Sequence, residues 1–248
     1  MITPNREDVI HKAWLYRVLT GIVDNPNLNE LYFKGGTCAA MLGYLDRFSV
    51  DLDFDYIGDT SESKVSNIRQ ELHHTFDKLD LEIKDESKTA LQFFLKYPIQ
   101  DPNKRNTLKV DISFPPPKAN IYEARNFVDI DRVINCQDIK TMFANKLVAI
   151  LDRYEKHNLI AGRDVYDIHH FFMNGYEYNS EVIKERTGLS VKDFFISLDK
   201  FISEKITDTI INQDLNVLLP YDKFSKIRKV LKSEVLMCIT QIKTGIAN

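Results

Sequence analysis

The order of apolar and polar residues predicts an α/β protein. Strands and helices mix in the first half of the chain, and the second half is helical. Residues 6–23 carry apolar side chains at four-residue spacing, which is typical of an amphipathic helix. Short apolar or alternating segments follow, as strands require. We expect strands over residues 31–33, 49–56, 79–84, 90–97 and 108–114, a short helix over 38–45, a longer one over 61–78, and one more short strand within 121–136.

The change to helical structure comes after three consecutive prolines, Pro115 to Pro117. They end the last predicted strand, because proline cannot donate to a β-ladder. Helices are then predicted over residues 137–154, 163–173, 191–203, 206–219 and 223–243. We therefore expect two domains, a core over residues 1–135 and a helical domain over residues 136–248.

The strand predicted over residues 49–56 places three carboxylates on one face. Side chains alternate with period two, so Asp51, Asp53 and Asp55 point one way and the apolar residues between them point toward the core. Like charges this close repel and raise one another's pKa, so they stay ionised only when water or a cation compensates. Hard oxygen ligands of this kind suit Mg²⁺ or Mn²⁺.

The strand predicted over residues 108–114 alternates in the same way and has Lys109 and Asp111 on its polar face. If this strand lies beside the acidic strand, Asp111 joins Asp51 and Asp53. Three carboxylates on two strands are what a two-metal nucleotidyl transfer needs, and we predict these three as catalytic metal ligands. The alternative is that Asp111 faces solvent on an edge strand.

A glycine turn lies between the apolar run 31–33 and the short helix. Gly35 and Gly36 let the backbone approach a ligand, and the free N–H groups of the following helix favour a phosphate. Thr37 is expected at the N-cap or in the first turn, where its hydroxyl could cap the helix or bind a phosphate oxygen. Such a turn, shortly before a Ser-x-Asp-x-Asp sequence, predicts a triphosphate site next to the metal that bridges to it.

Lys146 lies at the border of the apolar face of the helix predicted over residues 137–154. A lysine there usually extends its charge to solvent, so replacing it with methionine should change stability by no more than about half a kcal/mol. Asp164 and Asp167 share a face near the start of the next helix, where the helix dipole stabilises anions without any catalytic role. Either one could instead position Lys146 or a nucleotide base, and the sequence leaves this choice open.

Composition and charge narrow the class of protein. The net charge of −3 argues against a surface coated in basic residues for nucleic-acid binding, although a local basic patch is compatible with it. The three cysteines have neither paired nor metal-ligand spacing, which indicates reduced thiols in a cytosolic protein. No signal peptide or apolar run of bilayer length is visible, so we expect a cytoplasmic protein that makes no membrane contact.

One short segment near the C-terminus is strongly basic. Its cations are Lys223, Lys226, Arg228, Lys229 and Lys232. A charged helix face is usually only solvated. The alternative interpretation is contact with RNA phosphates.

Three segments resemble one known family. Lys34-Gly-Gly-Thr37, followed by Arg47-Phe-Ser-Val-Asp-Leu-Asp-Phe54, resembles the first motif of the AbiEii/AbiGii-type nucleotidyltransferase toxins, within the DNA polymerase β-like nucleotidyltransferase superfamily. Lys109-Val-Asp-Ile-Ser113 and Lys146 with Arg163-Asp-Val-Tyr-Asp-Ile168 resemble later motifs. The resemblance therefore spans residues 34–168, about half of the chain.

This resemblance has consequences for the fold and the site. It implies an α/β (α+β) nucleotidyltransferase core with a mixed β-sheet, followed by a C-terminal helical bundle that closes one side of the active cleft. It implies nucleotide-binding roles for Lys34, Arg47 and Ser49 beside the Gly35, Gly36 and Thr37 turn. It also implies catalytic roles for Lys146, Asp164 and Asp167, in addition to the three predicted metal ligands.

The function that follows is metal-dependent transfer of a nucleoside monophosphate from an NTP to an acceptor hydroxyl, with Mg²⁺ or Mn²⁺ as cofactor. The resemblance implies the toxin of a type IV toxin–antitoxin or phage abortive-infection system, with RNA, such as a tRNA 3′ end, as acceptor and a cognate antitoxin as partner. The alternative is a GTP- or ATP-binding regulator that acts through a partner without efficient transfer. A purely structural domain would leave the glycine turn and the acidic face unexplained.

Overall fold

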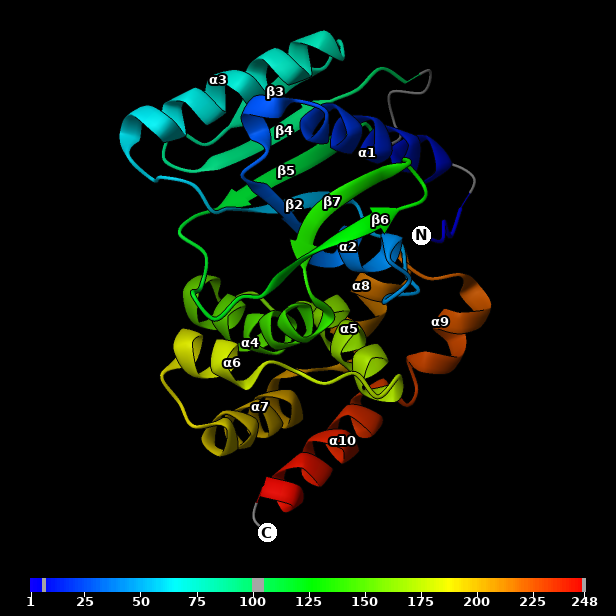
Figure 1. Cartoon of the computed structure of the whole chain (residues 1–248). Coiled ribbons are helices and arrows are strands. Elements are labelled where there is room, and N and C mark those ends of the chain that lie inside the picture. The colour runs from blue at the N-terminus through cyan, green and yellow to red at the C-terminus, as the bar shows by residue number, and fades with distance from the viewer. Residues whose placement is uncertain (6–7, 100–104, 247–248) are drawn as a thin grey trace. The chain divides into compact units, whose positions relative to one another are not determined.

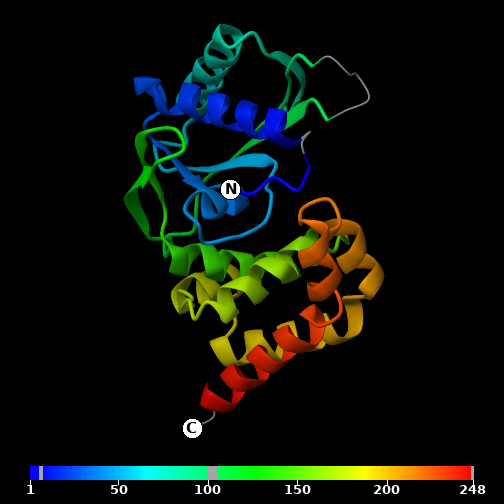
Figure 2. The same cartoon turned by 90° about the vertical axis from the view of Figure 1, so that its right-hand side faces the viewer.

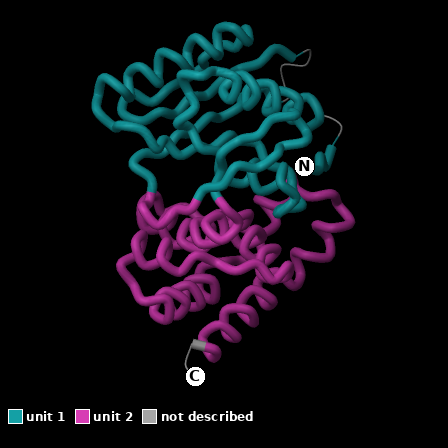
Figure 3. The backbone as a smooth tube through the Cα atoms, viewed as in Figure 1, with its two compact units in different colours: residues 1–116, 122–137 teal, residues 117–121, 138–248 magenta. Residues whose placement is uncertain are grey.

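The computed structural model describes residues 1–5, 8–99 and 105–246. They form two compact units (Figure 3). Unit 1 comprises residues 1–116 and 122–137, and unit 2 comprises residues 117–121 and 138–248. Because residues 117–121 belong to unit 2, the chain passes from unit 1 to unit 2 and back before it enters the helical segment.

Unit 1 is built on one mixed sheet of seven strands in the order β3-β4-β5-β2-β1-β7-β6 (Figure 1). β2 pairs antiparallel with β1 and parallel with β5, and β1 pairs parallel with β7. Antiparallel pairs complete both sides of the sheet. The strands are β1 (Leu31–Lys34), β2 (Asp51–Tyr56), β3 (Glu82–Glu86), β4 (Leu91–Lys96), β5 (Thr107–Ser113), β6 (Tyr122–Phe127) and β7 (Arg132–Gln137).

One face of this sheet is apolar and is covered by two helices. Leu52, Phe54, Phe93 and Val110 project from it and are fully buried. Helices α1 (Asp8–Val23) and α3 (Glu62–Lys78) lie side by side over this face (Figures 1 and 2). The ring of Phe76 on α3 packs edge-on against Phe93, with ring centroids 5.3 Å apart. The predicted beginning of the first helix, residues 6–7, lies outside the described residues.

Unit 2 is helical, as its sequence pattern predicts. Its first helix begins where the Asp138 side chain accepts a hydrogen bond from the Thr141 N–H, at 2.8 Å, and it ends at Asn158 in a left-handed conformation. Helices α7 and α10 pack side by side (Figures 1 and 2). The helices are α4 (Ile139–His157), α5 (Gly162–Met173), α6 (Ser180–Thr187), α7 (Val191–Lys205), α8 (Asp208–Leu215), α9 (Tyr221–Ile227) and α10 (Leu231–Ile246).

Three local expectations were wrong. The region 121–136 contains a two-stranded hairpin, β6 and β7, instead of one short strand, and α6 was not predicted. The helix expected over residues 223–243 is two helices, α9 and α10, with a turn between them. No glycine or proline marks that break, so tertiary packing must set it.

The helix α2 (Gly35–Met41) and the short 3-10 helix η1 (Pro26–Leu28) complete unit 1. The helix was expected to start after the glycine turn, but it begins at Gly35. The glycines therefore belong to its first turn.

The state of the three cysteines agrees with the expectation of reduced thiols. All three cysteines are free, Cys38 and Cys136 are buried, and Cys238 is partly exposed. Burial raises the pKa of the Cys38 thiol well above its usual value. In the part of the chain that the structure describes, no helix combines the length and apolarity needed to cross a membrane.

Candidate active site

The predicted carboxylates of the two strands lie on the same face of the sheet. β2 and β5 are parallel neighbours, with Asp53 opposite Asp111 and Asp51 opposite Lys109. Residues directly opposite each other on adjacent strands project to the same side, so the Asp53 and Asp111 side chains are adjacent. β5 lies between β4 and β2. The alternative of a solvent-facing acidic residue on an edge strand is therefore wrong.

Asp111 already has two partners in this arrangement. The Lys109 ammonium contacts its Oδ2. Gln92 on β4, which is opposite Asp111, donates its Nε2–H to the same oxygen at 3.0 Å. The side chains of Asp111 and Lys109 are each 28% exposed, so this corner of the polar face remains accessible to a ligand.

The glycine turn lies directly against Asp53. Gly35 has φ of +81°, in the left-handed region that favours glycine. A Cβ on Gly35 would lie 2.3 Å from Asp53 Oδ2, and a Cβ on Gly36 would lie 2.8 Å from Arg47 Nη2 and 2.9 Å from Ser49 Oγ. The missing side chains thus make room for three of the predicted site residues.

Thr37 and Arg47 are both buried and hold this loop together. Thr37 lies in the first turn of α2, and its hydroxyl donates to the Asp51 carbonyl at 2.5 Å. The N-cap of α2 is Lys34, without a side-chain cap. Arg47 Nη1 donates to the Phe48 carbonyl at 2.8 Å. Thr37 therefore ties α2 to the acidic strand, and Arg47 braces the loop that follows α2.

Lys34 is held by the third carboxylate of that strand. Its ammonium donates to Asp55 Oδ1 at 2.6 Å. Tyr122 and Gln137 donate to Asp55 Oδ2 at 2.9 and 2.7 Å. Asp55 is fully buried and fully hydrogen-bonded, which a buried carboxylate requires. It therefore anchors Lys34 and the β6–β7 hairpin, and it differs in this respect from the more exposed Asp51 and Asp53.

The chemistry of Asp51, Asp53 and Asp111 fits a hard divalent cation, because all three supply carboxylate oxygens. Their side-chain positions are not those of a closed metal cage: among the described residues, no three His, Cys, Asp or Glu side chains are grouped so that they could hold an ion. The Lys109 ammonium takes the place of a cation beside Asp111. Binding of a metal by both strands would require Lys109 to turn away.

Substitution of Gly35 should separate backbone strain from damage to the acidic strand. Gly43 has φ of +79° and nothing within 4 Å of an added Cβ. Gly43→Ala should therefore show only the cost of the left-handed backbone, about 1–2 kcal/mol. Gly35→Ala should carry this cost and also displace Asp53, so it alone should lose nucleotidyl transfer. Urea unfolding and transfer assays on both variants check this, and equal activity in the two would contradict it.

For Gly36→Ala we expect a smaller change in stability and a larger one in nucleotide affinity. The added methyl must push the Arg47 and Ser49 side chains aside, which costs about 1–3 kcal/mol in a packed environment. The same displacement narrows the loop that is predicted to receive the triphosphate, so the Kd for NTP should rise. Isothermal titration with NTP measures it. Unchanged affinity together with a large loss of stability would show that the turn is only structural.

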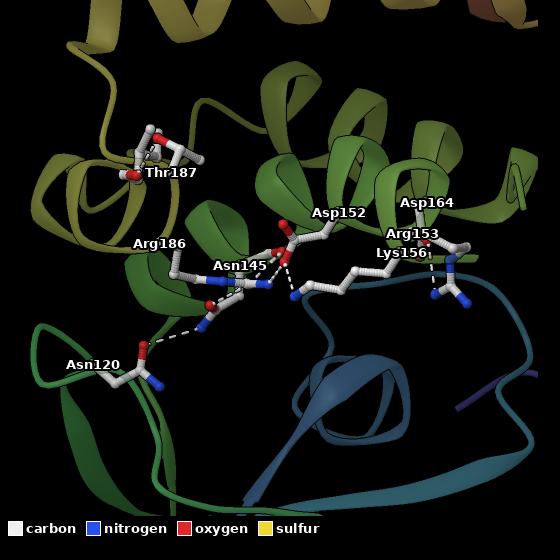
Figure 4. A network of polar contacts seen from close by, with 9 residues as sticks. Asn120, Asn145, Asp152, Arg153, Lys156, Asp164, Arg186 and Thr187 are labelled. Atoms are coloured by element: carbon white, nitrogen blue, oxygen red, sulfur yellow. Dashed lines mark hydrogen bonds and ion pairs between the residues drawn. The ribbon is translucent and has the colours of Figure 1, made fainter. Parts of the chain in front are cut away.

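Lys146, which is partly buried, and its two buried predicted partners form a cluster in unit 2. Lys146 Nζ lies 3.0 Å from Asp164 Oδ1 and 2.9 Å from Asp167 Oδ2. Both carboxylates are buried, with side chains 1% and 0% exposed. Arg153 Nη2 lies 3.2 Å from Asp164 Oδ2, and Figure 4 shows this pair. Lys146 thus does not extend freely into solvent, and both aspartates hold it.

A second polar network fixes α6 against the same helix (Figure 4). Arg186 donates to Asn145 Oδ1 at 2.8 Å. It also contacts Asp152, which lies two turns further along α4. Asn145 in turn donates to Asn120 at 3.2 Å. Because Asn145 precedes Lys146, this network holds the backbone that carries the lysine.

The charge balance of the cluster makes the stability of unit 2 sensitive to acid. Burial alone would raise the pKa of Asp164, but Lys146, Arg153 and Arg163 outweigh it and lower that pKa from 3.8 to about 2. A carboxylate with a lowered folded-state pKa stabilises the fold above its unfolded pKa, and this contribution disappears as the pH falls through the folded value. The shift corresponds to about 2 kcal/mol.

We therefore expect the stability difference between the parent and Asp164→Asn to be largest above about pH 4 and to shrink between about pH 4 and pH 2. The free energy of unfolding in urea, measured for both proteins across this range, checks it. A difference that stays constant from neutral pH to pH 2 would contradict the coupling of Asp164 to its cations.

Several residues of this region were not predicted as part of the site. Gln92, Asp55 and Arg153 contact the predicted site residues Asp111, Lys34 and Asp164. Tyr122 and Gln137 in turn donate to Asp55. Gln92 could have been assigned to the polar face of its strand from the sequence, because it is a polar residue between the apolar residues Leu91 and Phe93. The others make contacts that depend on strand order or helix packing, which no local pattern reveals.

The structure thus places a glycine turn against Asp53, and Asp53 opposite Asp111 on the neighbouring strand of a mixed sheet. Residues 17–221 match the family described as "Nucleotidyl transferase AbiEii toxin, Type IV TA system". The chain belongs to this AbiEii family. The resemblance seen in the three sequence motifs is thereby confirmed. The AbiEii match extends beyond residues 34–168 into most of unit 2, and a toxin of a type IV system has a cognate antitoxin.

Two solved structures share the fold of this AbiEii protein. JHP933 from Helicobacter pylori aligns with a TM-score of 0.61 and 20% identity, over 99% of this chain and 95% of its own. An H. pylori protein assigned provisionally to the nucleotidyltransferases aligns with the same TM-score and identity, over 98% and 97%. At this identity the likeness establishes the mixed α/β fold with its C-terminal helices. No curated protein is similar enough in sequence to match this chain.

Proposed function

We propose that this AbiEii protein transfers a nucleoside monophosphate from an NTP to a hydroxyl of RNA. The observation that carries the proposal is the placement of Asp53 opposite Asp111, with the Gly35 backbone against Asp53. A glycine turn can receive a triphosphate and neighbouring carboxylate oxygens can bind a divalent cation, so this arrangement supports the proposed reaction. Family membership supports the reaction class.

The residues of the acidic strands and of the glycine turn each have a specific role in this proposal. Asp51, Asp53 and Asp111 are the residues that would hold Mg²⁺ or Mn²⁺, which would supply activation of the attacking hydroxyl and stabilisation of the leaving pyrophosphate. The backbone at Gly35 and Gly36 approaches the triphosphate. Lys109, which contacts Asp111, would supply a cation to a phosphate oxygen.

Further groups complete the nucleotide site. Lys34, Thr37, Arg47 and Ser49 surround the glycine turn, and in this proposal Lys34 and Arg47 also face the triphosphate. Lys146, positioned by Asp164 and Asp167, supplies a cation to the charge that develops in the transition state.

The proposed acceptor is an RNA hydroxyl, such as a tRNA 3′ end. Modification of that end would stop translation, which suits a toxin whose action a cognate antitoxin restrains. Both substrates are present in the cytoplasm, and we place the reaction there.

Incubation with each labelled NTP in turn, with Mg²⁺ and total RNA, tests the proposal. We expect one or more nucleotides to label the RNA and the label to disappear when EDTA is added. Tight NTP binding without labelled RNA would overturn the proposal in favour of a nucleotide-binding regulator. Label in RNA that is insensitive to EDTA would overturn the metal assignment alone.

A further inference from the structure

Positive charge is concentrated on one short part of unit 2. Residues 221–232 contain five lysines and arginines and a single acid, Asp222, whereas the whole chain has a net charge of −3. The segment comprises α9 and the turn that leads into α10. Its charge is thus opposite in sign to that of the chain as a whole.

Two of these five cations have internal roles. Lys232 donates to the carbonyls of Ser203 and Ile206, at 2.9 and 2.8 Å, and so satisfies the C-terminal end of α7. The Lys223 ammonium lies 5.8 Å from the centroid of the Tyr166 ring. Neither side chain needs a ligand to explain its position.

The remaining three, Lys226, Arg228 and Lys229, are exposed, and we call them the basic surface. Within the ranges that the structure describes, none of them forms an ion pair with a carboxylate. Arg228 lies 5.5 Å from the ring of Phe224, which orients its guanidinium. Two exposed lysines elsewhere on unit 2, Lys140 and Lys184, pair with glutamates at 2.5 and 2.7 Å.

Aromatic and apolar groups flank the basic surface. Tyr221, the first residue of α9, is 77% exposed. A shallow hollow of about 430 Å³ beside Lys226 is lined by Ile227 and Val230, with Lys223 and Glu234 at its sides. An exposed ring and a hollow next to cations are features that receive unstacked bases in complexes with single-stranded nucleic acid.

We propose that the basic surface binds the phosphate backbone of RNA, with Tyr221 placed to stack on a base. This rests on the proposed function for the identity of the ligand, since RNA is its acceptor. An anionic membrane is the other partner that attracts lysine and arginine. α9 fits it poorly, because it has only seven residues and its apolar side chain Phe224 is buried in the protein. A helix that binds to a membrane must expose a continuous apolar face.

The test measures RNA binding without NTP. A labelled RNA hairpin with a single-stranded 3′ tail is titrated with full-length protein at several salt concentrations, and fluorescence anisotropy gives the Kd. The variant is Lys226→Gln/Arg228→Gln/Lys229→Gln. The matched control is Lys64→Gln/Lys192→Gln/Lys200→Gln, which removes the same charge from three exposed lysines elsewhere.

We expect the basic-surface variant to bind the hairpin at least about tenfold more weakly at low salt, and the slope of log K against log salt to fall by about 2. Each lost phosphate contact on a single strand contributes roughly 0.7 to that slope. The control should bind like the parent. Equal Kd and slope for the variant and the control would overturn the proposal. It would also be overturned if the basic-surface variant bound RNA like the parent but, unlike the parent, no longer bound anionic lipid vesicles.

Two further measurements separate this inference from the proposed function. Asp53→Asn should bind the hairpin like the parent although it transfers no nucleotide. The basic-surface variant should bind NTP like the parent. If the parent binds RNA through the basic surface but transfers no nucleotide, the proposed function fails and the inference holds. If transfer to RNA is intact in the basic-surface variant at limiting RNA, the inference fails and the proposed function holds.

Discussion

Asp53→Asn should abolish detectable nucleotidyl transfer while the protein stays folded. Asp53 is the carboxylate that lies against Gly35 and opposite Asp111, so in the proposed site it joins the glycine turn to the second acidic strand. Losing one preorganised group of this kind typically costs on the order of 10² to 10³ in rate, and losing a metal ligand should cost at least the upper value. The rate of label transfer to RNA under saturating NTP measures it.

The same variant should melt at or slightly above the temperature of the parent. In the metal-free protein, replacing one of several neighbouring carboxylates relieves repulsion. Asp85→Asn is the matched control, because Asp85 is exposed on the edge strand β3 of the same sheet and far in sequence from the motifs. A folded Asp53→Asn protein with parental activity would eliminate the two-metal assignment.

Lys146→Met should destabilise the protein strongly, which reverses the expectation from sequence. A lysine extending into solvent would cost almost nothing to replace, but Lys146 balances two carboxylates that are buried to 1% exposure or less. Removing it leaves Arg153 as the remaining ion-pair partner of Asp164, and breaking a buried pair typically costs about 3–5 kcal/mol. For a chain of this size the melting temperature should fall by roughly 10 °C.

A second variant tests this cause and then isolates the catalytic role. In Lys146→Met/Asp167→Asn the charge of Asp167, which Lys146 no longer balances, is removed, and the Asp164–Arg153 pair remains. Much of the lost stability should therefore return. If Lys146 acts on a phosphate, the repaired protein should still transfer nucleotide at least about tenfold more slowly than the parent. If it is as active as the parent, the lysine is structural and the chemistry belongs to the acidic strands.

Lys140→Met provides the control for both measurements. Lys140 is on the same helix and pairs with Glu177, but both side chains are more than half exposed. Exposed ion pairs contribute about 0–1 kcal/mol, so this variant should melt close to the parent. A Lys146→Met protein that melts like Lys140→Met would show that the buried cluster is not held by its charges.

The acidic face of the site could be predicted from sequence alone, because it depends only on local backbone geometry. Alternation along residues 49–56 and 108–114 places every second side chain on one face, whichever strands lie beside them. The glycine turn was similarly visible, since Gly35 adopts a conformation that other residues rarely take. These features also carry the family resemblance, which is why the motifs identified the family before any contact was known.

Only the tertiary structure decided which of these groups have partners. Asp55 appeared equivalent to Asp51 and Asp53, yet it is buried and bonded to Gln137, which lies 82 residues away in sequence. Lys146 looked like a border lysine, but its partners come from the following helix. The break between α9 and α10 carries no glycine or proline. Side-chain alternation is dictated by each residue's own backbone, whereas pairing and burial depend on chain segments that meet only when the protein folds.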